Sequence, residues 1–569
     1  MPKKPANLVY GVNDKPPLQI ILVLAFQHAF FLAGGLILAT VVMREIGGTP
    51  ELIQSVVTMA MIAGGIATIL QALGKGPIGS GYLCTEGIDP TFISSSILAG
   101  ATGGVSLIFG MTMVAGVIEC MLAPILRKLR ILFPPEVTGT VLTMVGLNIV
   151  PIMILNFLGV SSPSSPIEVS NVAVAIITLG AMVGINIWGN GKLRLYSITI
   201  GMAAGYVAAY SLGVLKASDI QRLVDTPFVS FPNVSHLAWS FDIRLLIPIL
   251  IATLASMLKS VATLAMCQKI NDSEWVRPDL ANIARGTFAD GLASVIGGLL
   301  GGMGQCLYPS SVGLSVATGA TSRIIAFFVG GIFISLAFLP KLAAIFTIMP
   351  RPVMGGALVF MVCFTIISGI QIITSRMIDT RRTFVIAISL MFGISVDMFP
   401  QLYQHVHPYL KPLFSSSLAV ATMLAVVLNM IVRIGITKHQ SIELTPCVDS
   451  ADRVFDFMEN LGAVWGARKE VVVRAASALV ELLEAAQCFY SGEKGIQVKV
   501  MFDEFNLDVK ACYQGQLIEF PTEPPNKHDL LADPLACARM AGFLVRQYVD
   551  HIAASQDGQS CRIELHFDH

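Results

Sequence analysis

The chain has 569 residues, of which 13% are charged and 54% hydrophobic. An ordinary soluble domain carries roughly 25% charged residues, so this composition excludes a wholly soluble protein and indicates a membrane protein. The 37 basic and 37 acidic residues balance, so no polyanionic partner such as nucleic acid is indicated, and the ten cysteines contain no CxxC pair that would predict a disulfide framework or a metal site.

Apolar runs near the length that a bilayer requires, about 20 residues, recur between residues 17 and 437. The start of the chain is polar, and the first apolar run is expected to stay as a span rather than be cleaved. Spans are predicted at 17–42, 52–72, 104–125, 137–158, 171–188, 194–214, 245–267, 281–302, 323–345, 353–375, 383–400 and 413–437. Two weaker stretches, 79–98 and 310–319, bring the total to about fourteen.

The loop charges predict the orientation of these spans. Basic residues occur in alternate loops, whereas the loop at 159–170 contains no Lys or Arg. The basic residues concerned are Arg127, Lys128, Arg130, Lys192, Arg194, Lys269, Arg277, Arg285, Arg376, Arg381 and Arg382. By the positive-inside rule both termini, with 1–16 as an N-terminal segment, are expected in the cytoplasm of a bacterial inner-membrane protein.

The two weaker stretches are rich in glycine and small hydroxyl residues, and each contains a proline. They read GSGYLCTEGIDPTF at 79–92 and GGMGQCLYPSSVGLSVATG at 301–319, in corresponding halves of the membrane region. Glycine and proline can simply kink a membrane helix. A matched pair of interrupted helices, however, is the best sequence indication of a binding site at the midplane of a transporter.

The composition changes after about residue 440. We expect a linker at 438–450, followed by a cytoplasmic α/β domain at 451–569 that is long enough for its own core. Helices are predicted at 468–490 and 532–554, and alternating sequences such as IQVKVMFDEF and RIELHF predict strands.

Several motifs in the membrane region, in order, resemble those of the nucleobase–ascorbate transporter family, also called nucleobase:cation symporter-2 or xanthine/uracil permeases. The matching residues are Gln27-His28, Gly79-Ser80-Gly81, Phe133-Pro134-Pro135-Glu136-Val137-Thr138-Gly139-Thr140 with Gly146, Ala289-Asp290-Gly291, Gly313, Thr318-Gly319, Ser322-Arg323, and Met349-Pro350-Arg351-Pro352-Val353-Met354-Gly355-Gly356. The resemblance covers residues 17–437.

This resemblance implies a mainly α membrane fold of seven plus seven inverted repeats, divided into core and gate domains and often assembled as a homodimer. It implies proton-coupled symport of a purine or related nucleobase of the xanthine/urate class by alternating access. Sodium is the other possible coupling ion, and no cofactor is expected. The expected partners are a small-molecule substrate, the lipid membrane and, through the tail, a cytoplasmic protein.

The sequence departs from the family where the resemblance implies the substrate site. Ala255 stands where the family usually has a glutamate, and Lys259 follows four residues later. In the tenth span Ser310 and Ser311 replace a Glu or Gln and an Asn, while Glu86 and Asp89 are acids that the family lacks at these positions. The implied substrate-binding residues are therefore Glu86, Asp89, Ala255, Ser256, Lys259, Ser310, Ser311 and Gly313.

An isolated ion near the bilayer centre costs roughly 2.5–3.5 kcal/mol, so the charges of Glu86, Asp89 and Lys259 are expected to face the cavity and to pair with one another. A carboxylate there could carry the coupling proton. Lys259 could instead bind an anionic solute or extend to the membrane boundary. Asp89 precedes Pro90 and could equally cap a half-helix.

Asp290 and His28 are further candidates for proton coupling or gating, with structural support and helix packing as their alternatives. His405 and His407 have the i, i+2 spacing of metal ligands, but without acidic or cysteine neighbours we predict no metal site.

The tail resembles the histidine-kinase-type ATPase fold. In that comparison Ala485 replaces the Mg²⁺-binding Asn, with Glu481 and Glu484 beside it, and residues 513–517 replace the DxGxG loop. These losses indicate a non-hydrolytic regulatory or dimerisation module. A sulfate-transporter-type anti-sigma-antagonist domain is the alternative.

The sequence contains no Walker loop, HExxH or nucleophile–base set, so an enzyme is not predicted. Two functional alternatives remain beside nucleobase transport. One is transport of another organic or inorganic anion on the same fold. The other is a membrane solute sensor that signals through the tail.

Overall fold

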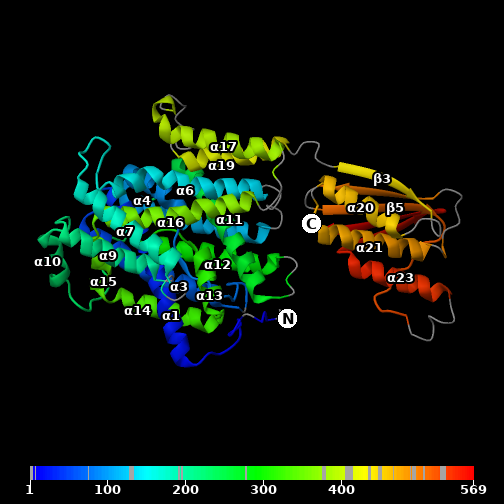
Figure 1. The fold of residues 1–569 in the computed structure, drawn as a ribbon, viewed down its shortest axis with the longest axis horizontal. Helices are drawn as coiled ribbons and strands as arrows, with labels where there is room; N and C mark the ends of the chain where they lie inside the picture. Colours follow the sequence, from blue (N-terminus) through cyan, green and yellow to red (C-terminus); the bar gives the residue numbers. More distant parts are fainter. Residues whose placement is uncertain are drawn as a thin grey trace. The chain divides into compact units, whose positions relative to one another are not determined.

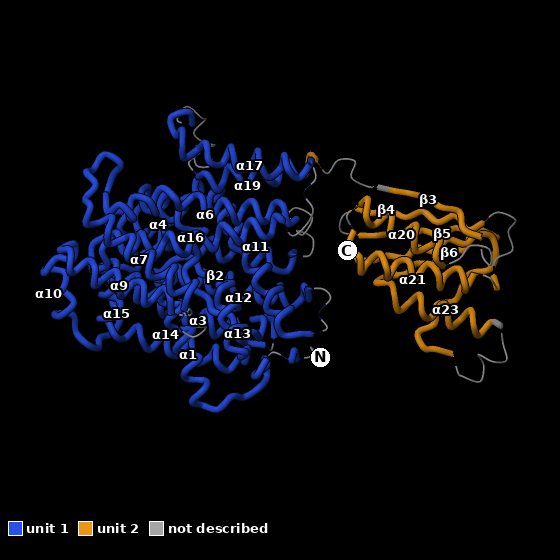
Figure 2. The backbone as a smooth tube through the Cα atoms, viewed as in Figure 1, with its two compact units in different colours: residues 1–429 blue, residues 430–569 orange. Residues whose placement is uncertain are grey.

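The chain forms two compact units, residues 1–429 and 430–569, which are described separately (Figures 1 and 2). The computed structural model describes residues 4–6, 8–74, 76–126, 134–189, 193, 196–273, 275, 278–374, 378, 380–403, 414, 416–432, 438–445, 451–465, 467–486, 488–489, 495–503, 506–525 and 534–568.

The first unit is almost entirely helical. Its long helices are α1 (Leu18–Ala33), α2 (Leu36–Glu45), α3 (Pro50–Ala72), α4 (Ile93–Leu122), α6 (Pro135–Phe157), α7 (Val169–Trp188), α9 (Ser197–Ser211), α10 (Ala217–Asp225), α11 (Leu246–Asn271), α12 (Leu280–Leu299), α13 (Pro309–Thr318), α14 (Arg323–Ala337), α15 (Pro340–Thr347), α16 (Arg351–Ile373), α17 (Thr380–Met398) and α19 (Ser417–Val432). Short 3₁₀ turns are η1 (Pro90–Phe92), η2 (Ala123–Ile125), η3 (Ile243–Leu245) and η4 (Pro400–Tyr403). Two short strands, β1 (Glu86–Ile88) and β2 (Gln305–Leu307), complete the unit.

Among the described residues, seven helical runs are long and apolar enough to cross a membrane, or eight if one bent pair counts as a span. That pair is α14 and α15, which meet at 79° where a single span over 323–345 was predicted. Pro340 begins α15 and cannot donate a backbone hydrogen bond, so the helix breaks before it. The predicted span at 17–42 is likewise divided into α1 and α2 at Gly34 and Gly35.

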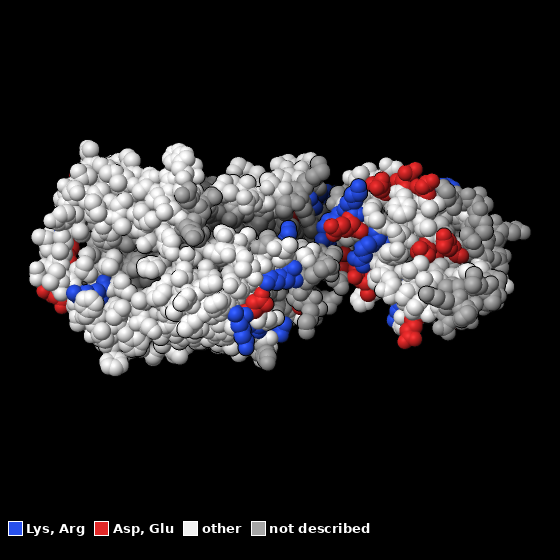
Figure 3. Space-filling view, turned by 60° about the horizontal axis from the view of Figure 1, so that its bottom comes forward, with Lys and Arg blue, Asp and Glu red and all other residues white. Residues whose placement is uncertain are grey.

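The outer surface of this unit has the character that a lipid environment requires. On the face in Figure 3 most of it carries neither acidic nor basic residues, and charges gather in a few clusters. Large apolar side chains remain exposed, among them Phe26, Ile176 and Trp188. In water such a surface would be unfavourable, so the chain is a multi-pass membrane protein.

The helices of this unit fall into two groups by their packing. The first helix group comprises α1 to α4 and α11 to α15, and the second comprises α6, α7, α9, α16 and α17. We include α19 in the second group because Gly393 of α17 lies directly against Ser417 and Ala421 of α19. Helices within a group pack extensively, for example α4 on α12 and α6 on α16, whereas contacts between the groups are sparse. This arrangement is compatible with two bodies that move against each other.

In its described residues the second unit is an antiparallel five-stranded sheet in the order β3-β4-β5-β7-β6 with three helices. The elements are β3 (Lys438–Leu444), α20 (Ala451–Trp465), α21 (Lys469–Ala486), β4 (Ile496–Phe502), β5 (Asn506–Gln514), α23 (Pro534–Tyr548), β6 (His551–Asp557) and β7 (Ser560–Asp568). Alternate strand residues are buried, and their apolar side chains pack with those of the helices in one core. The unit therefore has its own hydrophobic core, as the composition of 451–569 predicts.

Three elements of this unit differ from the sequence predictions. β3 occupies the first part of the segment expected to be a linker, and it pairs with β4 over seven residues. Helix α20 was not predicted, and the helix expected at 532–554 ends at Tyr548, where β6 follows. β6 is an edge strand exposed on most of its length, so its sequence HIAASQD lacks the alternation that reveals a half-buried strand.

We predict a pH dependence within the sheet at His566. Its Nδ1 lies 2.6 Å from Asp508, and its Nε2 lies 3.4 Å from Asp568. Partial burial opposes protonation, but the two carboxylates outweigh it and raise the pKa of His566 above its usual 6.5. A raised folded-state pKa stabilises the fold fully below about 6.5, and this stability is lost as the pH rises through the folded-state value.

Because His566 is about one third exposed, the effect should be below about 1 kcal/mol. The protection factors of the β5 and β7 amides in the full chain, which are corrected for the intrinsic pH dependence of exchange, should fall between pH 6 and pH 8. His566→Gln should remove this slope, and an unchanged slope would contradict the assignment.

Candidate functional site

The two stretches predicted to be interrupted lie against each other at the centre of the first helix group. β1 and β2 pair antiparallel, with Gly87 opposite Cys306. Each strand leads directly into a helical segment that begins with proline, η1 at Pro90 and α13 at Pro309. Two helix N-termini therefore start at one place inside the protein, where the positive ends of the helix dipoles favour a negative or electron-rich group.

Neighbouring helices hold this strand pair in position. The backbone N–H of Glu86 donates to Thr68 Oγ1 of α3 at 3.1 Å. Ser294 of α12 accepts from the N–H of Gln305 at 3.0 Å and donates to its carbonyl at 3.1 Å. The polar backbone of the interrupted segments is thus satisfied by side chains of complete helices, as a buried irregular backbone requires.

Asp89 and Lys259 form a buried ion pair beside the first of these N-termini. Lys259 Nζ of α11 donates to Asp89 Oδ1 at 2.6 Å, and the two side chains are 7% and 0% exposed. Asp89 Oδ1 also accepts from the N–H of Thr91 at 3.1 Å, so Asp89 caps η1 as well. The expected pairing of these charges is confirmed, and Lys259 does not extend to a membrane boundary.

Glu86, the third predicted charge, does not join this pair. Its carboxyl group is completely buried, and neither oxygen has a hydrogen-bond partner among the described residues. Asp290, predicted for coupling or gating, lies in α12 and accepts a hydrogen bond from Ser260, the residue after Lys259. Ser260 also lies 3.1 Å from Cys306 Sγ of β2, so Asp290 is connected to the strand pair through one side chain.

Glu119 of α4 is a buried acid that the sequence analysis did not select. It is completely buried, and its side chain interacts with that of Asp290. A close approach of α4 and α12 causes this contact: a Cβ atom on Gly116 would lie 2.4 Å from the carbonyl oxygen of Gly291. An acid inside the otherwise apolar run at 104–125 was the signal that could have revealed it.

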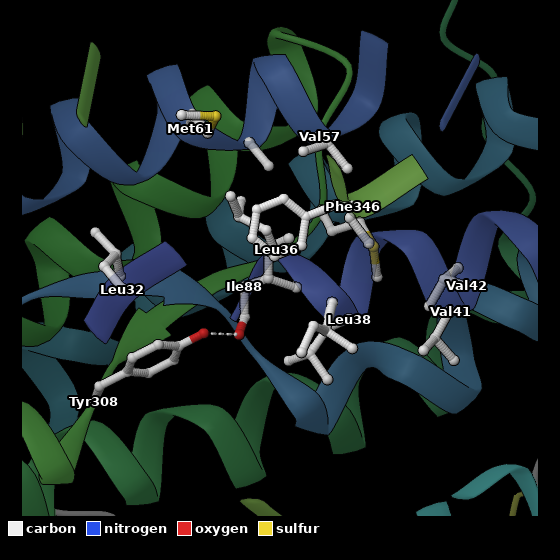
Figure 4. Packing of buried hydrophobic residues seen from close by; sticks show 14 of the residues in the cluster. Leu32, Leu36, Leu38, Val41, Val42, Val57, Met61, Ile88, Tyr308 and Phe346 are labelled. Carbon is white, nitrogen blue, oxygen red and sulfur yellow. Dashed lines mark hydrogen bonds between the residues drawn. The ribbon is translucent and has the colours of Figure 1, made fainter. Parts of the chain in front are cut away.

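Tyr308, immediately before α13, was also missed. Its hydroxyl donates to the carbonyl of Ile88 at 2.7 Å, which links β1 to the start of α13 (Figure 4). Lys259 Nζ lies 6.0 Å from the centre of its ring. Gly35 makes room for the hydroxyl, because a Cβ atom there would lie 2.1 Å from it. No motif in the sequence distinguishes this tyrosine from a packing aromatic.

We predict that Tyr308→Phe destabilises the strand pair modestly. The substitution keeps the ring and leaves the buried carbonyl of Ile88 without this donor, which costs about 1 kcal/mol. A fall in the melting temperature of purified protein would show the effect. Tyr82→Phe is a suitable control because Tyr82 lies outside the strand pair, and an equal fall in both variants would contradict the prediction.

The remaining predicted residues occupy different environments. Ala255 and Ser256 are buried on α11 near Lys259, and Ser311 Oγ accepts from the N–H of Thr85 at 3.1 Å. Ser310 and Gly313 lie on the exposed side of α13, and His28 is buried in α1, where neither ring nitrogen has a hydrogen-bond partner in the described part of the chain. The structure thus brings Asp89, Ser256, Lys259 and Ser311 near the strand pair, whereas Ser310 and Gly313 point elsewhere.

Two helix N-termini and a lysine whose charge is balanced by Asp89 thus lie together among buried apolar residues. This arrangement is suited to binding a small polar solute. Among the described residues no cluster of His, Cys, Asp and Glu could hold a metal ion. Several predicted features lie outside the described residues, including His405, His407, Phe133, the basic loop 127–130 and the basic residues 192, 194, 277 and 376.

Comparisons with known proteins agree with the motif order. Residues 19–402 match the xanthine/uracil permease family, described as a permease family. Xanthine permease XanP of Escherichia coli is 27% identical over 443 residues, covering 75% of this chain and 95% of XanP. Xanthine permease XanQ of the same organism is 26% identical over 463 residues, covering 79% and 98%.

A solved structure shows the same fold. Murine Solute Carrier 26 family member A9, an anion transporter solved in the inward-facing state, aligns with a TM-score of 0.50 at 10% identity. The alignment covers 77% of this chain and 72% of that chain. At this identity the likeness concerns the fold alone.

Proposed function

The chain belongs to the xanthine/uracil permease family, and we propose that it is a secondary transporter that takes up a purine or related nucleobase of the xanthine/urate class. As a permease it is a transporter rather than an enzyme. The observation that carries the proposal is the pair of helix N-termini that meet at β1 and β2 beside the Asp89–Lys259 ion pair.

Substrate recognition in this proposal uses the backbone and the ion pair together. Nucleobases present carbonyl and ring-nitrogen acceptors, which suit the ammonium of Lys259 and the positive end of the α13 dipole. Their N–H groups suit a carboxylate such as Asp89 or Glu86. Ser256 and Ser311 can adjust to either polarity because a hydroxyl both donates and accepts.

Coupling to protons is proposed at the buried carboxyl groups. Glu86 and Asp290 are completely buried, and each has at least one oxygen without a described partner. A single proton would satisfy such an oxygen, and its arrival or departure would change the charge beside the ion pair. Sodium held by the same oxygens is the alternative coupling ion. No cofactor is required.

Alternating access is supported by the division into two helix groups, and we propose that these groups are the core and gate implied by the family. The proposed topology is about fourteen segments arranged as seven plus seven, with both termini cytoplasmic in a bacterial inner membrane. A homodimer is proposed from the family resemblance.

Uptake of labelled xanthine, urate, guanine and uracil tests the proposal directly. Cells that lack their own permeases and express this chain should accumulate at least one purine, and an uncoupler that collapses the proton gradient should abolish accumulation. Protein present in the membrane without accumulation of any of the four bases would refute the proposal.

A second candidate is transport of another organic or inorganic anion, and Lys259 is the observation that favours it. Both carboxylates usual in the family are replaced, whereas a lysine lies beside the helix N-termini. If an anionic solute such as urate is transported, Lys259→Ala should abolish its transport. Unchanged transport would contradict the idea.

The role of the second unit is a separate proposal, a non-hydrolytic regulatory or dimerisation module of the histidine-kinase-type ATPase kind. Ala485 is buried in α21, and residues 513–517 comprise the last two residues of β5 and the three that follow. Because β3 belongs to this sheet, truncation should remove residues 433–569 as a whole. Flux through liposomes with and without them separates a transporter from a sensor whose membrane region only binds solute.

A further inference from the structure

We propose that Asn148 is a latch that holds the start of α4, in the first helix group, against the second helix group. Its amide nitrogen donates to Ser94 Oγ in the first turn of α4. Its amide oxygen accepts from Ser417 Oγ of α19 at 2.6 Å. One side chain of α6 therefore links a helix of its own group to the interrupted helix of the other group.

Burial makes this link energetically significant. Asn148 is 8% exposed and Ser417 is fully buried, so water does not readily replace the bond between them, whereas Ser94 is only partly buried. In a membrane protein a hydrogen bond between helices contributes about 0.6 kcal/mol on average and about 1.7 kcal/mol at most. A contribution of this size alters a conformational equilibrium without preventing movement.

Ser417 fixes the orientation of the latch. An amide can present either its oxygen or its nitrogen to a neighbour. The hydroxyl of Ser417 donates to the oxygen and directs the amide nitrogen toward Ser94. Ser417→Ala should therefore weaken the latch without removing either of its ends.

The latch acts on the helical segment next to the Asp89–Lys259 ion pair, which belongs to the proposed binding site. Ser94 follows Asp89 by five residues, so the bond holds the helical segment that the ion-paired Asp89 caps. α6 is fixed within its own group, because a Cβ atom on Gly139 would lie 2.6 Å from the carbonyl oxygen of Gly369 in α16. Movement of the first group against the second must therefore break the bond between Asn148 and Ser94.

A comparison bond shows what is particular to Asn148. Tyr206 of α9 donates to the carbonyl of Ile345 in α15, which also joins the two groups. Neither of these residues belongs to an interrupted segment. Asn148 instead bonds to a side chain within the interrupted helix, so its hydrogen bonding depends on the position of that helix.

Hydrogen–deuterium exchange of residues 86–102 tests the latch without knowledge of the substrate. Asn148→Ala and Ser94→Ala should each accelerate exchange there by roughly three- to twentyfold, the size expected for one such bond. The double variant should exchange no faster than either single variant. Asn156→Ala is the matched control, since this buried amide on the same helix donates to Ile152 within α6 at 2.9 Å.

Unchanged exchange in Asn148→Ala, acceleration in Asn156→Ala of the same size, or additive effects in the double variant would each overturn the latch. A second measurement, of transport, rests on the proposed function. In liposomes loaded with whichever of xanthine, urate, guanine and uracil the protein transports, Asn148→Ala should raise the exchange kcat and leave KM within about twofold. A changed KM with constant kcat would make Asn148 a substrate contact, whereas absence of any transport would refute only the proposed function.

Discussion

Lys259→Met should abolish transport and strongly destabilise the first unit. The substitution leaves Asp89 buried without its cation, and breaking a buried ion pair in this way costs about 3–5 kcal/mol. The loss should appear as a large fall in the melting temperature of detergent-purified protein, or as a low yield of folded protein.

A double variant distinguishes the loss of stability caused by the unpaired charge from the loss caused by altered packing. Asp89→Asn combined with Lys259→Met removes both charges, and asparagine can still cap η1. The double variant should recover much of the melting temperature but not transport. If the double variant is as unstable as Lys259→Met alone, the uncompensated charge of Asp89 is not the cause of the destabilisation.

An exposed ion pair of the same length provides the control. Lys510 Nζ lies 2.7 Å from Glu564 in the second unit, but the side chains are 35% and 41% exposed. Lys510→Met should cost at most about 1 kcal/mol because solvent screens such a pair. A comparable loss in both variants would show that burial does not determine the effect.

Gly116→Ala should destabilise the first helix group by forcing α4 and α12 apart. The new methyl group would lie 2.4 Å from the carbonyl oxygen of Gly291 and 2.6 Å from the nitrogen of Val295. These are backbone atoms that cannot rotate away, so overpacking should cost about 1–3 kcal/mol. Transport should also fall, since Glu119 would move relative to Asp290.

A glycine-to-alanine substitution at a position without close neighbours is the control for Gly116→Ala. Gly180 lies in α7, and nothing lies within 4 Å of a Cβ atom built there. Gly180→Ala should be neutral or stabilising by up to about 1 kcal/mol, because alanine favours the helix. Equal melting temperatures for the two alanine variants would contradict the proposed packing.

The two interrupted helices show what amino-acid composition alone can predict. Glycines, prolines and hydroxyl residues at 79–92 and 301–319 predict two interruptions, and both stretches contain a strand followed by a helical segment. The pairing of β1 with β2 joins residues more than 200 positions apart. Local composition contains no information on such a register, which tertiary packing alone fixes.

The second unit shows the opposite limitation. Strands half buried against helices were visible as alternation, and β4, β5 and β7 were predicted. The edge strand β6 and the initial strand β3 were not, because an exposed edge places no consistent apolar pattern on its residues.

The sequence by itself determined the membrane class, the permease family, the two interrupted helices and the presence of three charges where the family differs. Hydrophobic runs and motif order are local properties, so they can be read without a fold. Only the tertiary structure decided that Lys259 pairs with Asp89 and not with Glu86, and that Glu119 meets Asp290. Those contacts depend on helices that approach closely at glycines such as Gly116 and Gly291, and the distances between helices are a property of packing, not of any one segment.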